Sequence, residues 1–139
     1  MKLCSMVGIA FVCVAVSACS VLRPEPPLQS LAPVELYQKL CSSCHGVEGR
    51  GDGPVAPLIK IHVPDLTRLA ARDGGEFPTE NVRLVIDGRS DRRAHGPRDM
   101  PVWGWQLYDS SNIDDATERA RTNALIDRLV RYLESIQRS

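Results

Sequence analysis

Two cysteines and a histidine stand close together in the sequence CSSCH, at residues 41–45. Thiolates and imidazoles bind metal ions, and a pair of thiols can also cycle between dithiol and disulfide. The same spacing, Cys-x-x-Cys-His, is the attachment signature of covalently bound haem. The motif is therefore compatible with three kinds of site: a zinc centre, a redox dithiol and a haem anchor.

The surrounding sequence discriminates among these sites. A redox dithiol belongs near a βαβ pattern, whereas the residues before Cys41 have helical spacing and no strand rich in Val or Ile leads into the motif. A structural zinc ion needs four ligands, but there is no second Cys-x-x-Cys pair, and His62 and His95 are isolated. The motif therefore favours haem.

Helical geometry explains why this spacing suits a haem. A helix that runs to about Cys44 puts Cys41 and Cys44 one turn apart on one face. Two thioether bonds can then form from the same side. His45 comes four residues after Cys41 and returns to that face, so we predict that it binds the iron.

The second axial ligand must come from elsewhere in the chain, and the candidates are Met100, His95 and His62. Residues 19–139 contain one methionine, Met100, in the stretch HGPRDMPVWGW. Pro101 restricts the backbone after it, and Trp103 offers a large ring that could cover a cofactor. A lone methionine can also fill a core, but Met and His are a standard pair of haem ligands, so Met100 is favoured over His95.

Residues 1–18 have the pattern of an export signal. Lys2 precedes an apolar run from Met6 to Val16 that is too short to span a bilayer, which takes about 20 residues. The sequence VSAC at 16–19 resembles a lipobox, which predicts acylation of Cys19. A plain signal peptide is the alternative.

Residues 19–31 contain SVLRPEPPLQS directly after Cys19 and predict a proline-rich tether, which leaves 32–139 as the domain. Ser20 after the cysteine favours the outer membrane over the inner one. We therefore expect the protein on the periplasmic side of a bacterial envelope, or free in the periplasm if Cys19 is not acylated.

Removing the signal also simplifies the composition. Cys4 and Cys13 leave with it, so the domain keeps only Cys41 and Cys44 and has no long-range disulfide framework. Lys2 is the only charge lost, which leaves 16 basic against 17 acidic residues. A nearly neutral chain without a basic stripe argues against nucleic acid as a partner.

The rest of the chain predicts helices joined by loops. A first helix begins near Pro33 and ends at Gly46, and a long loop follows to Pro64. Shorter helices are expected over Asp65–Arg72 and from a Thr79 cap to Ile86, where Asp87-Gly88 ends the second one. The last helix begins at Ser111 or Asn112, with Asp114 and Asp115 favourable at its positive end. The expected inward residues are Val34, Tyr37, Leu40 and Cys44 in the first helix, Val82, Val85 and Ile86 in the third, and Leu125, Leu129, Leu133 and Ile136, with Tyr132 beside them, in the last.

Taken together, these pieces resemble a class I c-type cytochrome. The matching stretches run from LYQKLCSSCHGVEGRGDGPVAP through VPDLTRLA, VRLVIDGR and HGPRDMPVWG to LIDRLVRYLESIQ. The resemblance implies an all-α fold in which the first and last helices cross and loops wrap one covalent haem. It also implies that the carbonyl oxygen of Pro54 accepts a hydrogen bond from His45.

The function implied is that of an electron carrier rather than an enzyme, with redox proteins as donor and acceptor and His45 and Met100 as iron ligands. Trp103, Trp105 and Arg89 are candidate partners of the haem propionates. A docking rim is one interpretation of Arg89, Arg92, Arg93 and Arg98. Acidic residues lie between these arginines, which favours a solvated loop of mixed charge over a docking rim. The alternatives are a haem sensor that binds a small ligand and a haem subunit of a larger oxidoreductase complex.

Overall fold

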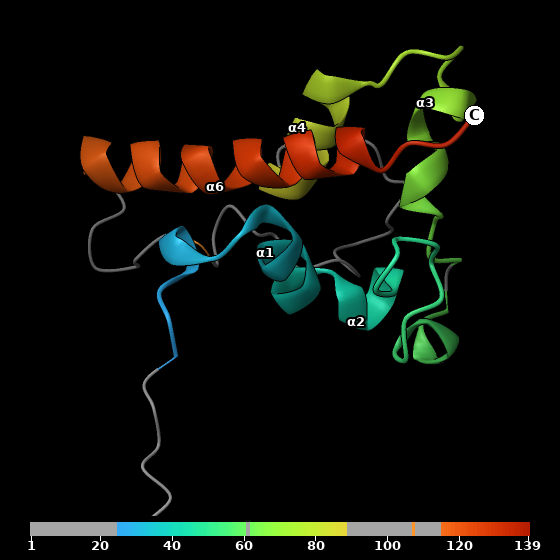
Figure 1. The fold of residues 1–139 in the computed structure, drawn as a ribbon, viewed down its shortest axis with the longest axis horizontal. Coiled ribbons are helices and arrows are strands. Elements are labelled where there is room, and N and C mark those ends of the chain that lie inside the picture. Colours follow the sequence, from blue (N-terminus) through green and yellow to red (C-terminus); the bar gives the residue numbers. More distant parts are fainter. Residues whose placement is uncertain (1–24, 61, 89–106, 108–114) are drawn as a thin grey trace, which may run out of the picture.

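A long helix near the C-terminus organises the fold (Figure 1). The structure is a computed structural model that describes residues 25–60, 62–88, 107 and 115–139. Helix α6 (Ala116–Ser135) contains 20 residues, and the side chain of Asp115 caps it by accepting a hydrogen bond from the Thr117 N–H at 2.7 Å. The helix thus begins later than the predicted start at Ser111 or Asn112, and one of the two expected acidic residues is its cap.

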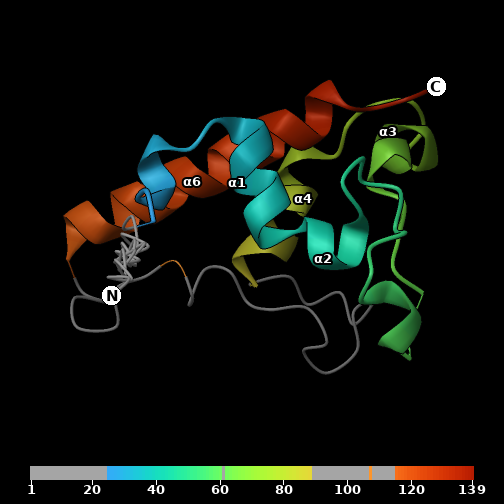
Figure 2. The same ribbon diagram turned by 60° about the horizontal axis from the view of Figure 1, so that its bottom comes forward.

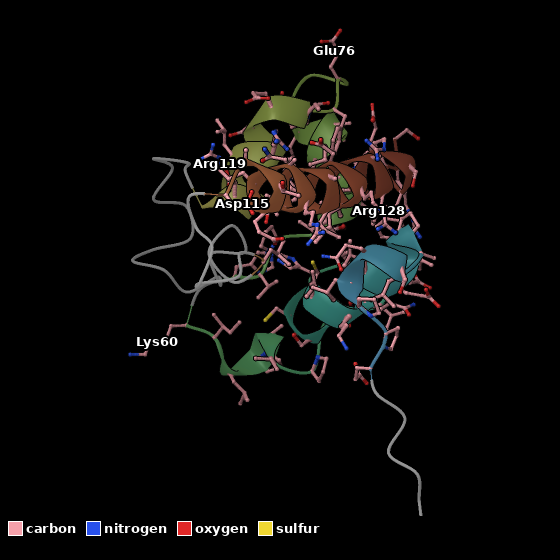
Figure 3. The ribbon with its side chains drawn as sticks, turned by 90° about the vertical axis from the view of Figure 1, so that its left-hand side faces the viewer. Lys60, Glu76, Asp115, Arg119 and Arg128 are labelled. Atoms are coloured by element: carbon pink, nitrogen blue, oxygen red, sulfur yellow. The ribbon has the colours of Figure 1, made fainter. Side chains whose placement is uncertain are left out.

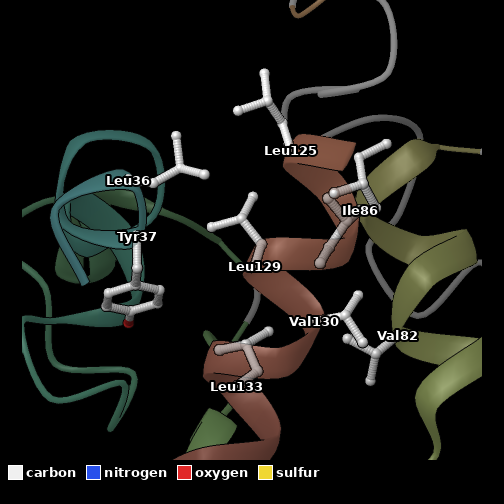
Figure 4. Packing of buried hydrophobic residues seen from close by; sticks show 9 residues of the cluster. Leu36, Tyr37, Val82, Ile86, Leu125, Leu129, Val130 and Leu133 are labelled. Carbon is white, nitrogen blue, oxygen red and sulfur yellow. The ribbon is translucent and has the colours of Figure 1, made fainter. Parts of the chain in front are cut away.

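Helix α6 packs against one helix on each side (Figure 4). Leu129 and Leu133 face α1 (Pro33–Leu40), as the predicted apolar stripe requires, while Val130 faces Val82 of α4 (Thr79–Asp87). The prediction included only the first of these faces. Burial of both faces makes α6 the centre of the hydrophobic core.

Helix α1 begins at Pro33, as predicted, and buries Leu36 and Tyr37 completely. Val34, predicted to face inward, is 40% exposed because it lies in the first turn, beyond the contact with α6. Glu35 returns to the start of the helix, where its carboxylate accepts a hydrogen bond from the N–H of Ala32 at 2.7 Å. The buried pair therefore sets how α1 lies against α6.

The predicted single helix over Cys41 and Cys44 is interrupted. Helix α1 ends at Leu40, Cys41 has φ −121° and ψ −30°, and a separate turn, α2, covers Ser42–His45. It ends as predicted at Gly46, whose φ of +78° is a conformation that glycine adopts readily. The interruption turns α2 away from the axis of α1 (Figure 2).

Short helical turns connect α2 to α4. They are η2 (Ala56–Leu58), η3 (Leu66–Arg68) and α3 (Leu69–Arg72), and the last two together form the helix predicted over Asp65–Arg72. Thr79 is the first residue of α4 rather than its cap, because Pro78 occupies the cap position and its carbonyl oxygen accepts from the N–H of Val82. Gly88 ends α4 in a left-handed conformation, as predicted.

The N-terminal end of the described chain packs against the same core. Part of the predicted tether forms the helical turn η1 (Leu28–Ser30), and Leu28 and Leu31 contact the core cluster. Arg128 of α6, labelled in Figure 3, donates to the carbonyl oxygens of Gln29, at 3.0 Å, and Leu31. The segment before α1 is therefore attached to the domain.

No strand occurs within the described ranges, which agrees with the predicted all-α class. Among the same residues, no helix is long and apolar enough to cross a membrane.

Candidate cofactor site

Both cysteines of the motif are free thiols, and both are partly buried. Cys41 lies at the junction of α1 and α2, where its carbonyl oxygen accepts from the N–H groups of Cys44, at 3.2 Å, and His45, at 2.9 Å. Burial, with the nearby Cys44 as a smaller cause, raises the pKa of Cys41 to about 12. A redox dithiol needs a lowered thiol pKa, so this environment does not suit that alternative.

His45 is the buried member of the motif, with 9% of its surface exposed. Its ring nitrogen Nδ1 lies 3.3 Å from the carbonyl oxygen of Pro64. When Nδ1 donates to this oxygen, Nε2 carries the lone pair that a metal ion requires, and the bond also fixes the orientation of the ring.

The acceptor at this position is Pro64 and not Pro54, which corrects the expectation from the resemblance. Pro54 is exposed and lies between two residues whose N–H groups bond to α2: Gly53 donates to Cys44 and Val55 to Ser43. These bonds hold the Pro54 segment along the backbone of α2. The chain reaches the imidazole only later, at Pro64.

The loop after α2 satisfies the carbonyl oxygens at the end of that helix (Figure 2). The donors are alternate N–H groups of the loop, at distances between 2.8 and 3.1 Å. Gly51, Gly53 and Val55 donate to His45, Cys44 and Ser43, respectively. The carbonyl oxygen of the next residue, Gly46, accepts from the hydroxyl of Tyr37 at 2.8 Å.

Two glycines permit close backbone contacts of this loop, Gly53 with α2 and Gly51 with Val63. A Cβ atom on Gly53 would lie 2.4 Å from the carbonyl oxygen of Ser43, and one on Gly51 would lie 2.4 Å from that of Val63. Real Cβ atoms essentially never come so near to backbone atoms. The sequence alone did not indicate the contacts that require these glycines.

The three side chains of the motif do not form a metal cage. In the part of the chain that the structure describes, no group of three or more His, Cys, Asp and Glu side chains could hold a metal ion. The zinc alternative therefore gains no support there. Two thiols, and an imidazole that Pro64 orients, instead suit a large prosthetic group that the protein binds at several atoms.

The remaining predicted site residues lie outside the described residues. They are Cys19, Arg89, Arg92, Arg93, His95, Arg98, Met100, Trp103 and Trp105. His62 is described and is exposed, as expected of a loop residue.

The cytochrome c family model matches residues 34–137, from the start of α1 to the residues after α6. The chain belongs to the cytochrome c family. Searches of curated proteins and of solved structures gave no match. The family consists of haem-binding electron-transfer proteins, and membership implies covalently bound haem c.

The site of this cytochrome c fits such a haem. Cys41 and Cys44 are both free thiols, and the tautomer of His45 that donates to Pro64 presents Nε2 as a ligand. The sequence did not identify Pro64 as the hydrogen-bond partner of this histidine. Pro64 does precede Asp65, the cap of η3, but nothing in the sequence placed its carbonyl oxygen against the ring.

Proposed function

We propose that this protein is a single-haem c-type cytochrome that carries electrons between redox proteins in the bacterial cell envelope. Cys41 and Cys44 form the thioether bonds, and His45 and Met100 bind the iron from opposite sides. When bound, haem supplies a one-electron Fe(III)/Fe(II) couple. Two protein ligands leave no open position for a substrate, which makes the protein a carrier and not an enzyme.

The state of His45 is the observation that carries this proposal. The ring is buried, and its Nδ1 engages the carbonyl oxygen of Pro64 at 3.3 Å. A hydrogen bond to the far nitrogen of a ligating histidine raises the basicity of the ligand and prevents rotation of the ring. The same arrangement suits an iron that changes charge without changing its ligands.

Sequence arguments supply the other ligand and its surroundings. Met100 is the one methionine of residues 19–139. A methionine ligand opposite a histidine raises the reduction potential. Trp103 and Arg89 are proposed to lie near the haem, as a covering ring and a propionate partner.

Export and anchoring complete the proposal. Residues 1–18 are removed as a signal, Cys19 receives lipid, and the domain faces the periplasm, preferably at the outer membrane. The near balance of charge in residues 19–139 is consistent with a redox protein as partner rather than a nucleic acid.

Visible spectra of the haem-loaded protein test the proposed ligands. A sulfur-to-iron charge-transfer band in the ferric form, with a ferrous form that does not react with carbon monoxide, is the expected result. A six-coordinate low-spin spectrum without the band would replace Met100 by His95. A high-spin ferrous form that binds carbon monoxide would favour a ligand-binding sensor.

A second measurement distinguishes a stand-alone carrier from a subunit of an oxidoreductase complex. Purification from membranes after mild detergent extraction should give the cytochrome by itself. Stable co-purification with a dehydrogenase or oxidase would favour the subunit. Mass spectrometry of the mature N-terminus should find acylated Cys19, and an unmodified N-terminus would contradict the anchor.

A further inference from the structure

Tyr37 places a hydroxyl group next to the residue that follows His45. The side chain is completely buried, and its hydroxyl donates to the carbonyl oxygen of Gly46 at 2.8 Å. Burial raises the pKa of this phenol above its ordinary value. Helix α1 thus reaches the end of α2 through one side-chain bond.

The packing of two helices determines where this hydroxyl lies. The ring of Tyr37 packs on the ring of Tyr132 in α6, with centroids 5.0 Å apart and an interplanar angle of 39°. A Cβ atom on Gly49 would approach the hydroxyl to 3.4 Å and Ile136 Cδ1 to 3.2 Å. Neighbours from α6 and from the loop therefore confine the phenol.

The bonded carbonyl group belongs to Gly46, the residue directly after the candidate ligand. Gly46 is itself buried and has φ +78°, so the chain turns sharply there. The carbonyl oxygen of His45 accepts from the N–H of Gly51 at 2.8 Å. These two contacts hold the backbone on the C-terminal side of the histidine, and Pro64 holds its ring.

We infer that Tyr37 is a positioning residue for His45. Its hydroxyl links the α1–α6 contact to the carbonyl group of Gly46, one residue after the ligand, and so limits how far the backbone that carries the imidazole can move. This inference rests on the proposed ligation by His45. A histidine with a fixed ring donates to the iron in a single orientation, so loss of the hydroxyl should alter the electronic structure of the centre as well as the stability of the fold.

The test compares two haem-loaded variants, Tyr37→Phe and Tyr132→Phe. Each keeps its ring in the aromatic pair, but only the first removes the hydroxyl that donates to Gly46. The N–H of Gly49, which donates to the same oxygen at 3.2 Å, remains in both variants. Electron paramagnetic resonance of the ferric protein and an electrochemical titration report on the ligand, because both depend on the orientation and donor strength of the histidine. Thermal unfolding reports on the fold.

We expect Tyr37→Phe to shift the g values and to raise the reduction potential, while Tyr132→Phe matches the unaltered protein. The expected rise corresponds to about a threefold change in the ratio of reduced to oxidised protein at a fixed potential, roughly 28 mV for one electron. Wild-type g values and potential in Tyr37→Phe would overturn the inference, even if the variant unfolded at a lower temperature.

A measurement on the unaltered protein applies if Tyr37→Phe accumulates poorly. In the diamagnetic ferrous form, nuclear magnetic resonance should detect a slowly exchanging Tyr37 hydroxyl proton close to the Gly46 α protons. A rapidly exchanging or undetected proton would overturn the inference. Failure of the unaltered protein to attach haem would instead contradict the proposed function.

Discussion

The backbone of α2 and the loop behind it lie so close together that the side chain at position 53 decides whether they can meet. The Gly53 N–H bonds to Cys44 at 3.1 Å, and a Cβ atom at this position would lie 2.6 Å from that same carbonyl oxygen. The atoms nearest to this Cβ all belong to the backbone, so they cannot move away by rotation of a side chain. A single methyl group here must therefore move the loop or the turn that carries the histidine.

Gly53→Ala should lower the free energy of unfolding by about 3 kcal/mol, the upper part of the range for an overpacked site. Denaturant unfolding of the haem-loaded protein measures this change. Gly74→Ala is the control for an added methyl group that meets no other atom, because nothing lies within 4 Å of a Cβ at Gly74. Unlike Gly53, Gly74 has a positive φ, +75°. The control should cost about 1 kcal/mol from the left-handed backbone alone. Equal losses in the two variants would show that the close contact at Gly53 is not important.

Asp65 gives the short helix η3 a pH dependence. The Thr67 hydroxyl donates to its carboxylate at 2.7 Å and the Thr67 N–H at 2.8 Å, and the side-chain bond is the main cause that lowers the pKa of Asp65 below its ordinary 3.8. A lowered pKa in the folded state means that the carboxylate stabilises the fold above its unfolded pKa. This contribution is lost as the pH falls through the folded pKa.

Asp65→Asn keeps a capping oxygen but removes the charge. The variant should be less stable than the original protein at pH 7, by about 0.5 kcal/mol or less, because exposed charge effects at helix ends are small. The difference should shrink below about pH 4. Unfolding by urea between pH 3 and pH 7 measures both curves. A difference that stays constant over this range would contradict the assignment, and Asp73→Asn, at an exposed position, provides the control.

At the scale of elements, the two faces of α6 explain what the sequence could predict. Leucines spaced by four residues indicated one apolar stripe, and the structure confirms it against α1. Ile126 and Val130 are also buried, each one residue after a leucine of the stripe. Val130 faces α4, a distant segment, so the local pattern could not reveal which helix would cover it.

The sequence predicted the C-terminal end of a helix correctly where a glycine determined it, but it did not predict the N-cap of α4 or the break at Cys41. Gly46 and Gly88 end their helices as predicted, because both adopt left-handed or similar conformations. Thr79 failed as a cap because Pro78 took that position, and the break at Cys41 has no sequence signal that we recognise.

Val130→Ala should test the second face of α6. The side chain is 4% exposed and packs toward α4, so its truncation should lower the free energy of unfolding by about 2 kcal/mol. Arg131→Ala, at the exposed neighbouring position, should change stability by less than about 0.5 kcal/mol. Denaturation of haem-loaded protein measures both. Equal values would mean that α4 does not depend on this contact.

At the scale of the whole molecule, the CSSCH motif helped to predict the fold correctly, but the hydrogen-bond partner of its histidine was predicted wrongly. The motif and the final apolar helix were sufficient to indicate a cytochrome c fold, since both follow from short local patterns. The histidine's partner was misplaced by ten residues, from Pro64 to Pro54. A long loop can approach the imidazole by several paths. The hydrogen bonds from the N–H groups of Gly51, Gly53 and Val55 to α2 determine which proline lies beside the ring.

The segment before α1 connects the domain to the proposed lipid anchor. Its attachment to α6 depends on Arg128, whose guanidinium donates to the carbonyl oxygens of Gln29 and Leu31. A charged donor to a carbonyl group contributes about 1.5–3 kcal/mol. This bond therefore shortens the part of the proposed tether that can move independently of the domain.

Arg128→Ala should release this segment without unfolding the core. The N–H groups of Ser30 and Leu31 bond to the carbonyl oxygens of Pro27 and Leu28, so their hydrogen exchange reports on η1. We expect exchange at these two amides to accelerate about tenfold or more, since 1.4 kcal/mol corresponds to a factor of ten. Amides in the centre of α6, such as that of Leu129, should keep their protection, and Arg131→Ala should leave all of them unchanged. If Ser30 and Leu31 exchange no faster in Arg128→Ala, then the apolar contacts of Leu28 and Leu31 with the core are sufficient to hold the segment. In that case the arginine does not determine where the proposed tether becomes free of the domain.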